Sequence, residues 1–341
     1  MTAIQPAAGS AAAAPAPAPA GSLARSGRTV DVSVLVPARD EAENLPLFME
    51  LAAEALAGER ASYEVVIVDD GSSDDTWGVL TALAARYPFL RIVRHRTGHG
   101  IADALRTAYS HSSGDILVFY PADLQYKPED IPRLVAPILA DESDIVTGFK
   151  QGAYDKAFVS RVYNSLSRSL FKVSVRDLNS VKAYRREVME SVPARPDWHR
   201  YLVVMAAAQG FSVAEVPVPL YPRHAGRSKF GIGRIPVGVL DMLAVWFELR
   251  FARKPLLLFG MLGAALFVLG VLVGIGAILW RIFMGQGFRP VIDLVVVCLT
   301  VGSIAFATGL IAELVAAQRA ELAEMRRRME EIARERQSPE A

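Results

Sequence analysis

Three short acid-rich clusters are the residues of this sequence best suited to chemistry. They read PARDE at 37–41, DDGSSDD at 69–75 and PADLQ at 121–125, and each comes after a run of apolar residues. Carboxylates gathered around one crevice repel each other unless a cation or donor hydrogens lie between them. A divalent metal ion that carries a diphosphate would satisfy such a crevice. The clusters therefore predict a site for a metal ion and a phosphate-bearing ligand.

Helix capping is the structural alternative for part of these clusters. Asp40 with Glu43, and Ser72 with Asp75, have the spacing of capping boxes. Asp74 and Asp75 also suit the first turn of a helix, where the helix dipole favours negative charge. For these residues a structural role at a helix start is the preferred interpretation.

Asp70 and Asp123 are harder to explain by capping, because each follows an apolar run that is expected to be a strand. For them a functional role is the preferred interpretation. A nicotinamide-binding turn is excluded, because the first strand is followed by PARDE rather than by G-x-G-x-x-G, and Gly98 and Gly100 lack the third glycine.

The apolar runs before the clusters are expected to form one sheet. Five β-branched runs alternate with helix-period stretches such as 43–57 and 75–87. Nearly continuous apolar strands with helices between them indicate an α/β fold with a mostly parallel sheet, covered on both faces. Ligands of such sheets bind beyond the carboxyl ends of the strands. The predicted strands are 32–37, 63–70, 90–95, 115–121 and 144–148.

Composition narrows the function class. The chain of 341 residues is 52% hydrophobic with a formal net charge of +1, so it lacks the basic excess expected of a nucleic-acid-binding protein. Cys298 is its single cysteine, which excludes an internal disulfide and is interpreted as a small core residue. Residues 1–28, almost all Ala, Pro, Gly and Ser, are expected to be a disordered tail without the features of a signal peptide.

Two long uncharged apolar runs near the C-terminus predict membrane spans, assigned to 255–282 and 290–317. A pair of buried core helices is the alternative. Basic residues precede the first run and follow the second, whereas the short loop between them holds only Arg281 and Arg289. Because basic residues favour the cytoplasmic side, we expect a multi-pass membrane protein whose catalytic domain and both termini are cytoplasmic.

The segments that flank these runs have helical patterns of their own. Residues 230–254 alternate apolar and charged positions at helical spacing, which favours an interfacial helix over an ordinary packed helix. Residues 318–341 form a charged tail, in which 319–337 is interpreted as a solvated helix. A coiled coil, and with it a homo-oligomer, is the alternative for that tail.

Taken in order, the motifs resemble the inverting family 2 glycosyltransferases of the dolichol-phosphate-mannose synthase type. The two C-terminal spans further resemble the bacterial subgroup that acts on undecaprenyl phosphate. The resemblance implies a GT-A α/β sandwich over 29–229. It also implies inverting transfer of a sugar from a nucleotide-sugar donor to a polyprenyl phosphate, undecaprenyl or dolichyl. The motifs are VSVLVPARDEAENLP (32–46), EVVIVDDGSSDDT (64–76), FYPADLQYKPED (119–130), GFK (148–150) and RHAGRSK (223–229).

The same resemblance implies roles for individual residues. Those expected to hold the nucleotide base and ribose are Pro37, Arg39, Glu41, Val68 and Asp70. Those expected around the diphosphate and metal are Ala122, Asp123 and Gln125, with Asp123 and Gln125 as ligands of Mg²⁺ or Mn²⁺. Those expected to neutralise phosphate charge from the acceptor side are Lys150, Arg223 and Lys229. The candidate catalytic residues are Asp123, Arg223 and Lys229.

Two departures from the family pattern stand out. Pro121 occupies the position of the first acid of the D-A-D motif, and Arg39 replaces the aromatic residue that usually faces the base. Two other functions remain open. A polysaccharide synthase would carry Q-x-x-R-W, yet none of the four tryptophans follows an arginine. A non-catalytic nucleotide-sugar binder would fit the loss of the first acid.

Overall fold

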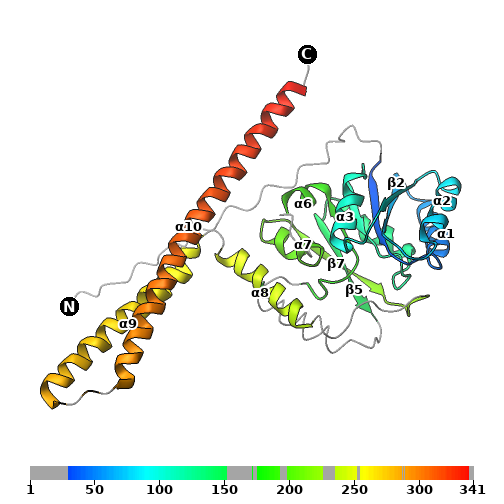
Figure 1. The fold of residues 1–341 in the computed structure, drawn as a ribbon. Coiled ribbons are helices and arrows are strands. Elements are labelled where there is room, and N and C mark those ends of the chain that lie inside the picture. The colour runs from blue at the N-terminus through cyan, green and yellow to red at the C-terminus, as the bar shows by residue number, and fades with distance from the viewer. Residues whose placement is uncertain are drawn as a thin grey trace, which may run out of the picture. The chain divides into compact units, whose positions relative to one another are not determined.

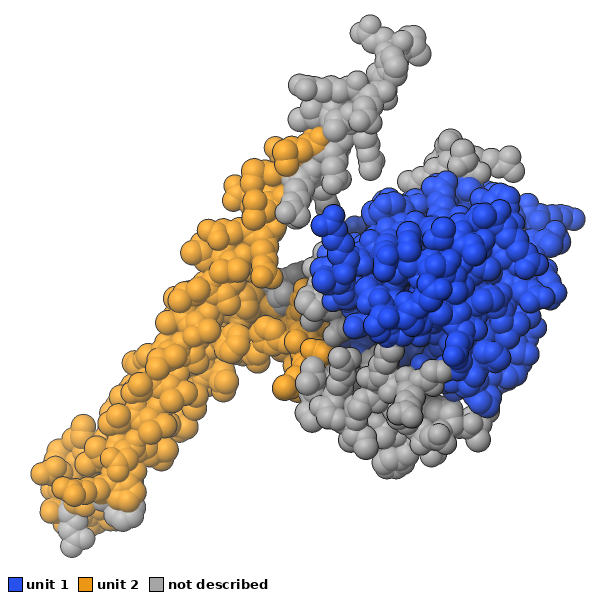
Figure 2. Space-filling view, turned by 45° about the vertical axis from the view of Figure 1, so that its right-hand side comes forward, with its two compact units in different colours: residues 1–232 blue, residues 233–341 orange. Residues whose placement is uncertain are grey.

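The chain divides into two compact units, residues 1–232 and 233–341, coloured separately in Figure 2 and described separately below. The predictions for the N-terminal tail, for Lys229 and for most of RHAGRSK fall on residues outside those described. The computed structural model describes residues 30–151, 171, 175–192, 198–225, 235–251, 254–285, 287 and 289–337.

The first unit is built on a seven-stranded sheet in the order β3-β2-β1-β4-β6-β5-β7. The pairs β1–β2, β1–β4, β2–β3 and β5–β7 are parallel, whereas β6 runs antiparallel to both of its neighbours. The sheet is therefore mixed but mostly parallel, as the sequence predicted. The strands are β1 (Val32–Ala38), β2 (Tyr63–Asp70), β3 (Leu90–His95), β4 (Ile116–Phe119), β5 (Ile145–Gln151), β6 (Lys182–Arg185) and β7 (Val213–Pro219).

Helices cover both faces of this sheet (Figure 1). Val32, Val34 and Val36 of β1 pack into one apolar cluster with residues of α1, α2 and α4. Leu35 points to the opposite face, because side chains alternate along a strand. That face is covered by α3, α6 and α7. The helices are α1 (Leu45–Leu56), α2 (Thr76–Arg86), α3 (Ile101–Ser110), the 3₁₀ turn η1 (Pro128–Asp130), α4 (Ile131–Leu139), α6 (Arg186–Ser191) and α7 (Trp198–Ala207).

The five predicted strands are all present, with small differences at their ends. β4 ends at Phe119, so Asp123 lies four residues beyond the strand rather than directly after it. β5 continues to Gln151, which places Lys150 inside a strand. Since β2, β1 and β4 are neighbours, the three acid-rich clusters emerge from adjacent strands at one edge of the sheet.

The described part of the second unit contains three helices, α8 (Ile235–Phe251), α9 (Pro255–Met284) and α10 (Arg289–Gln337). α9 and the first part of α10 are long and apolar enough to cross a membrane, and only 17% of each apolar window is buried. A core helix of a soluble protein would be mostly buried. The apolar surface left exposed therefore favours membrane spans over the alternative of core helices.

Glycines allow α9 and α10 to pack at very short range. A Cβ atom on Gly263 would lie 2.5 Å from the backbone nitrogen of Phe306, and one on Gly302 would lie 2.7 Å from that of Phe267. Small residues permit such close approach of two helices in a membrane. The hairpin of α9 and α10 therefore depends on these glycines.

Candidate active site

The loops after β1 and β2 are joined by side-chain hydrogen bonds. Asp40 accepts hydrogen bonds from the backbone N–H and hydroxyl of Ser73 (2.7 and 3.0 Å), and its own N–H donates to the Ser72 hydroxyl (2.9 Å). The capping role expected for Asp40 and Ser72 is wrong, because the N-cap residues of α1 and α2 are Asn44 and Asp75. These polar residues hold two loops together instead.

The residues expected near the nucleotide base surround this junction. Pro37 and Val68 are direct partners in the β1–β2 register, and Val68 is completely buried, so it offers a ligand only its backbone. Glu41 accepts a hydrogen bond from the Asn44 amide (2.6 Å), and its backbone N–H donates to the Thr76 hydroxyl (2.9 Å). These two hydrogen bonds fix the side chain and the backbone of Glu41 in the loop after β1.

Asp70, the last residue of β2, organises the loop after β3. Its carboxylate accepts hydrogen bonds from the backbone N–H groups of His99 (2.8 Å) and Gly100 (2.7 Å), and lies 2.8 Å from Nδ1 of His95. Burial raises the pKa of this carboxyl, but the hydrogen bonds from His99, His95 and Gly100 outweigh it and hold the pKa below its usual value. Asp70 is thus an ionised anchor for this loop.

Arg39 lies against the same loop. A Cβ atom on Gly98 would be 2.6 Å from Nη1 of Arg39, and one on Gly71 would be 2.5 Å from the backbone nitrogen of Gly98. Gly71 also has a positive φ of 65°, which glycine adopts without strain. The guanidinium of Arg39 therefore packs against Gly98, in the loop that Asp70 organises.

The PADLQ turn presents Asp123 by a local hydrogen bond. Asp123 Oδ1 accepts the backbone N–H of Gln125 (3.2 Å), and Leu124 between them has a φ of 57°, in the left-handed region. A non-glycine residue in this region is uncommon and often marks a functional turn. Ala122 is buried beneath it.

Arg223 joins this turn from a distant part of the chain. Its Nη2 lies 2.9 Å from Asp123 Oδ2 and 3.1 Å from Gln125 Oε1, so one nitrogen contacts both side chains. The backbone of Tyr221 donates to the Gln125 carbonyl (2.9 Å), and Asn44 donates to the Ala225 carbonyl (3.4 Å). The segment 221–225 therefore spans from the PADLQ turn to the loop after β1.

The charge on Asp123 is balanced by Arg223. Burial raises the pKa of the Asp123 carboxyl, and the guanidinium opposes that effect without cancelling it. Only 13% of the Asp123 side chain is exposed, compared with 25% for Arg223. A carboxylate in such a place needs a cation beside it.

Comparison with known proteins shows the family of this chain. Residues 33–189 match the model of glycosyl transferase family 2. The chain is 31% identical over 261 residues to the undecaprenyl-phosphate 4-deoxy-4-formamido-L-arabinose transferase of Sodalis glossinidius, which covers 75% of this chain and 78% of that protein. The chain belongs to glycosyltransferase family 2. This glycosyltransferase is also 28% identical over 299 residues to the dodecaprenyl-phosphate galacturonate synthase of Rhizobium johnstonii, covering 85% and 88% of the two chains.

Solved structures of glucosyl-3-phosphoglycerate synthase from Mycobacterium tuberculosis share the fold of this glycosyltransferase. The complex with Mn²⁺, uridine diphosphate and phosphoglyceric acid has a TM-score of 0.53 at 23% identity, over 64% of this chain and 78% of that one. The complex with Mg²⁺ and uridine diphosphate has a TM-score of 0.52 at 23% identity, over 64% and 79%. The predicted GT-A type sheet is confirmed by this likeness.

The ligand set expected for a metal ion fits the observed side chains. Asp123 Oδ2 and Gln125 Oε1 converge on one point, which Nη2 of Arg223 occupies. Mg²⁺ is commonly held by one or two carboxylates together with substrate phosphates and water. Within the described residues, no group of three His, Cys, Asp or Glu side chains is placed to bind a metal. The two oxygens would therefore need a diphosphate to complete the coordination.

Lys150 pairs with Asp177 in this glycosyltransferase, at 3.1 Å. Beside this pair lies Lys182, which is 2% exposed and donates to the carbonyls of Leu178 (3.0 Å) and His199 (2.8 Å). Burial lowers the pKa of Lys182 to about 8. Of this cluster the motifs predicted Lys150, but neither Asp177 nor Lys182.

The sequence analysis did not identify three of the residues described above: His95, Asp177 and Lys182. For Lys182 a signal existed, because a lysine interrupts the apolar run VKAY at 181–184. A buried charged residue in a strand has to be paired or hydrogen-bonded, which makes it a candidate for a polar site. His95 and Asp177 carry no such signal, since their roles depend on contacts distant in sequence.

Proposed function

We propose that this glycosyltransferase moves a sugar from a nucleotide-sugar donor onto a polyprenyl phosphate, with inversion, at the cytoplasmic membrane face. The two relatives named above are called undecaprenyl- and dodecaprenyl-phosphate transferases, and each alignment covers more than three quarters of the relative's length. Their shared acceptor class is the reason for proposing the same class here.

The observation that carries the proposal is the contact of Arg223 with Asp123 and Gln125. Arg223 belongs to the segment that directly precedes the helical unit in sequence. Its guanidinium reaches the turn at which the donor's diphosphate is expected. A cation in this position would lie between two phosphate groups, one from the donor and one from the acceptor.

The acceptor makes particular demands on such a site. A phosphate monoester has a second pKa of about 6, so it is largely dianionic in the cytoplasm and needs no enzymic base to act as a nucleophile. The obstacle is repulsion between this dianion and the donor diphosphate. Arg223, with Lys229 from the same motif and Lys150 from β5, would screen that repulsion.

Asp123 and Gln125 would hold the divalent cation, Mg²⁺ or Mn²⁺. When bound, the cation would stabilise the charge that grows on the leaving diphosphate. The structural neighbours were solved with Mn²⁺ or Mg²⁺. The loop junction of Asp40, Ser72 and Ser73 would fix the other side of the nucleotide subsite.

The domain arrangement follows the same proposal. Residues 29–229 form the catalytic domain, and 230–254 form an interfacial helix region. Two transmembrane helices occupy 255–282 and 290–317, and 318–341 is a charged cytoplasmic tail. The excess of basic residues outside the loop between α9 and α10 supports a cytoplasmic location for both ends.

A transfer assay tests the proposed function. The full chain, purified in detergent, is incubated with Mn²⁺, undecaprenyl phosphate and a panel of radiolabelled UDP- and GDP-sugars. Label from one donor is expected to pass into the organic phase. Phosphoglyceric acid serves as a water-soluble control acceptor and is expected to receive none.

The alternatives predict different outcomes of this assay. A polysaccharide synthase would put label into a polymer without needing the lipid phosphate. A non-catalytic binder would retain a labelled donor without transferring it. Either result would contradict the proposed function.

A further inference from the structure

The contact between Arg223 and the PADLQ turn has a consequence for metal binding. Nη2 of Arg223 lies 2.9 Å from Asp123 Oδ2 and 3.1 Å from Gln125 Oε1, the two oxygens that would bind the metal. A divalent ion would have to come within about 2.0–2.2 Å of such oxygens. It would then overlap the guanidinium, so Arg223 and the metal exclude each other from this position.

The sequence of the turn strengthens this competition. Because Pro121 replaces an acid, PADLQ carries a single carboxylate, that of Asp123. The positive charge of Arg223 already neutralises it. A metal ion that arrives alone would have to displace a guanidinium from its counter-ion and would gain no further negative charge from the turn. A diphosphate changes that balance, because it brings negative charge for both cations.

The geometry allows Arg223 to move without rearranging the fold. The backbone around it is held by the hydrogen bonds of Tyr221 to Gln125 and of Asn44 to Ala225. Its side chain is 25% exposed, whereas that of Asp123 is 13% exposed. The long arginine side chain can therefore turn toward solvent while Asp123 and Gln125 stay in place.

We propose that Arg223 is a resident counter-ion of Asp123 that keeps the metal position closed until a nucleoside diphosphate arrives with the metal. The displaced guanidinium is then free to contact phosphate. Arg223 acts here as a positioning residue, and the proposal rests on the metal role assigned under the proposed function. It makes metal and nucleotide binding strongly interdependent, and such coupling is reciprocal.

Binding of Mn²⁺, followed by the electron paramagnetic resonance signal of the free ion, tests this without any turnover. Wild type and Arg223→Met are titrated without nucleotide and with UDP or GDP. Methionine has similar length but neither charge nor hydrogen-bond donors. The expected result is Mn²⁺ binding at least about tenfold tighter in Arg223→Met than in wild type when nucleotide is absent, a gain of 1.4 kcal/mol per tenfold.

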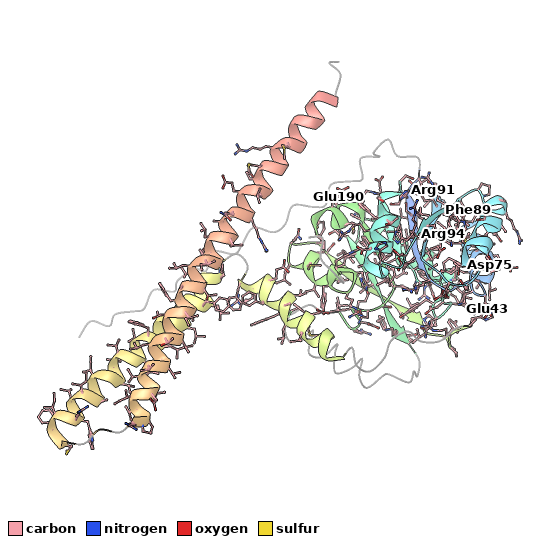
Figure 3. The ribbon with its side chains drawn as sticks, in the orientation of Figure 1. Glu43, Asp75, Phe89, Arg91, Arg94 and Glu190 are labelled. Carbon is pink, nitrogen blue, oxygen red and sulfur yellow. The ribbon has the colours of Figure 1, made fainter. Side chains whose placement is uncertain are left out.

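The addition of nucleotide should reduce the difference in Mn²⁺ affinity between wild type and Arg223→Met. UDP or GDP is expected to tighten Mn²⁺ binding in wild type by a factor at least about ten times larger than in Arg223→Met, since the variant has no guanidinium to displace. Arg223→Lys, which keeps the charge, should resemble wild type. Arg91→Met is the matched control, because the Arg91 side chain is 54% exposed and pairs with Glu64 rather than with the PADLQ turn; Arg91 lies on the same unit and is labelled in Figure 3. It should change neither titration.

The outcomes distinguish the counter-ion role of Arg223 from the metal-binding role of Asp123 and Gln125. If wild type binds Mn²⁺ with nucleotide but Arg223→Met shows the same affinities as wild type, the counter-ion role is wrong and the metal role stands. If wild type binds no Mn²⁺ even with UDP or GDP, the metal role fails and the inference fails with it. Arg223→Gln, checked for folding by circular dichroism, replaces the methionine variant if that variant does not fold, and the same two outcomes apply.

Discussion

Asp123 combines burial with charge at the level of single residues. Its carboxyl has a pKa raised by burial, and its oxygens contact Arg223 and the Gln125 backbone. Replacing it removes the one carboxylate that the PADLQ turn offers to a metal. We therefore predict that Asp123→Ala lowers the transfer rate by at least about a hundredfold, the scale of losing a key electrostatic contact in a transition state.

The measurement is the lipid-transfer assay at saturating donor and Mn²⁺. Glu54→Ala, an exposed residue of α1, is the control and should keep full activity. Both variants should retain the circular dichroism spectrum of wild type. Normal transfer by folded Asp123→Ala in the presence of metal would refute the assignment.

The site residues show which contacts a sequence can predict. Asp70 and Asp123 were identified because each follows a strand whose apolar pattern is local. The partners that define their chemistry, His95 for Asp70 and Arg223 for Asp123, come from other loops. Asp123 and Arg223 are brought together only by folding, so no local pattern could reveal that a guanidinium occupies the position proposed for the metal.

At the level of secondary structure, the strands were predicted well because their apolar runs are continuous. The order β4-β6-β5-β7 could not be predicted, because β6 is four residues long and pairs antiparallel with strands far away in sequence. The capping interpretation of Asp40 failed for a related reason. Its spacing suited a cap, but hydrogen bonding to Ser73 in the next loop was available instead.

The start of β2 offers a test of stability away from the site. Glu64 is 3% exposed and accepts hydrogen bonds from the Ser33 hydroxyl (2.6 Å) and the Ser113 hydroxyl (2.8 Å). We predict that Glu64→Gln destabilises unit 1 by about 1–3 kcal/mol, because a buried charged acceptor is lost. Intrinsic fluorescence during denaturant unfolding measures this, with Glu54→Gln as the exposed control.

The same residue gives a pH dependence with a defined sign. Burial raises the pKa of Glu64, but the hydrogen bonds from Ser33 and Ser113 and the charge of Arg91 outweigh it and leave the pKa below its ordinary 4.5. Glu64 therefore contributes stability above pH 4.5 that is lost as the pH falls through the lower, folded pKa. The difference between wild type and Glu64→Gln should shrink on acidification, and a difference that grows would contradict this account.

The glycines of α9 provide a matched pair of substitutions. A Cβ atom on Gly263 would lie 2.5 Å from the backbone of α10, whereas one on Gly276 would meet nothing within 4 Å. We predict that Gly263→Ala lowers the melting temperature of the detergent-solubilised protein by several degrees. Gly276→Ala should be neutral or slightly stabilising, because alanine favours a helix by about 1 kcal/mol over glycine. Equal melting temperatures would show that the close contact is unimportant.

At the level of the whole molecule, the proposed topology makes one clear prediction. Tags at residues 5 and 341 should be protected from protease in sealed right-side-out vesicles, whereas a tag at Gln286 should be cleaved. The reason is the concentration of basic residues outside the loop between α9 and α10. An accessible C-terminus would mean that one of the two helices does not cross the membrane.

The helix α10 runs without interruption from Arg289 to Gln337. If Ala317 marks the membrane boundary, the remaining helix extends for about 30 Å at 1.5 Å per residue. A continuous helix fixes the direction in which each of its side chains points, because each residue turns the chain by about 100°. Inserting one residue after Ala317 would therefore rotate every later side chain to a new side of the rod while lengthening it by only about 1.5 Å. A partner that binds one face of this helix would therefore lose its binding surface. A partner that depends only on the length of the helix would be unaffected.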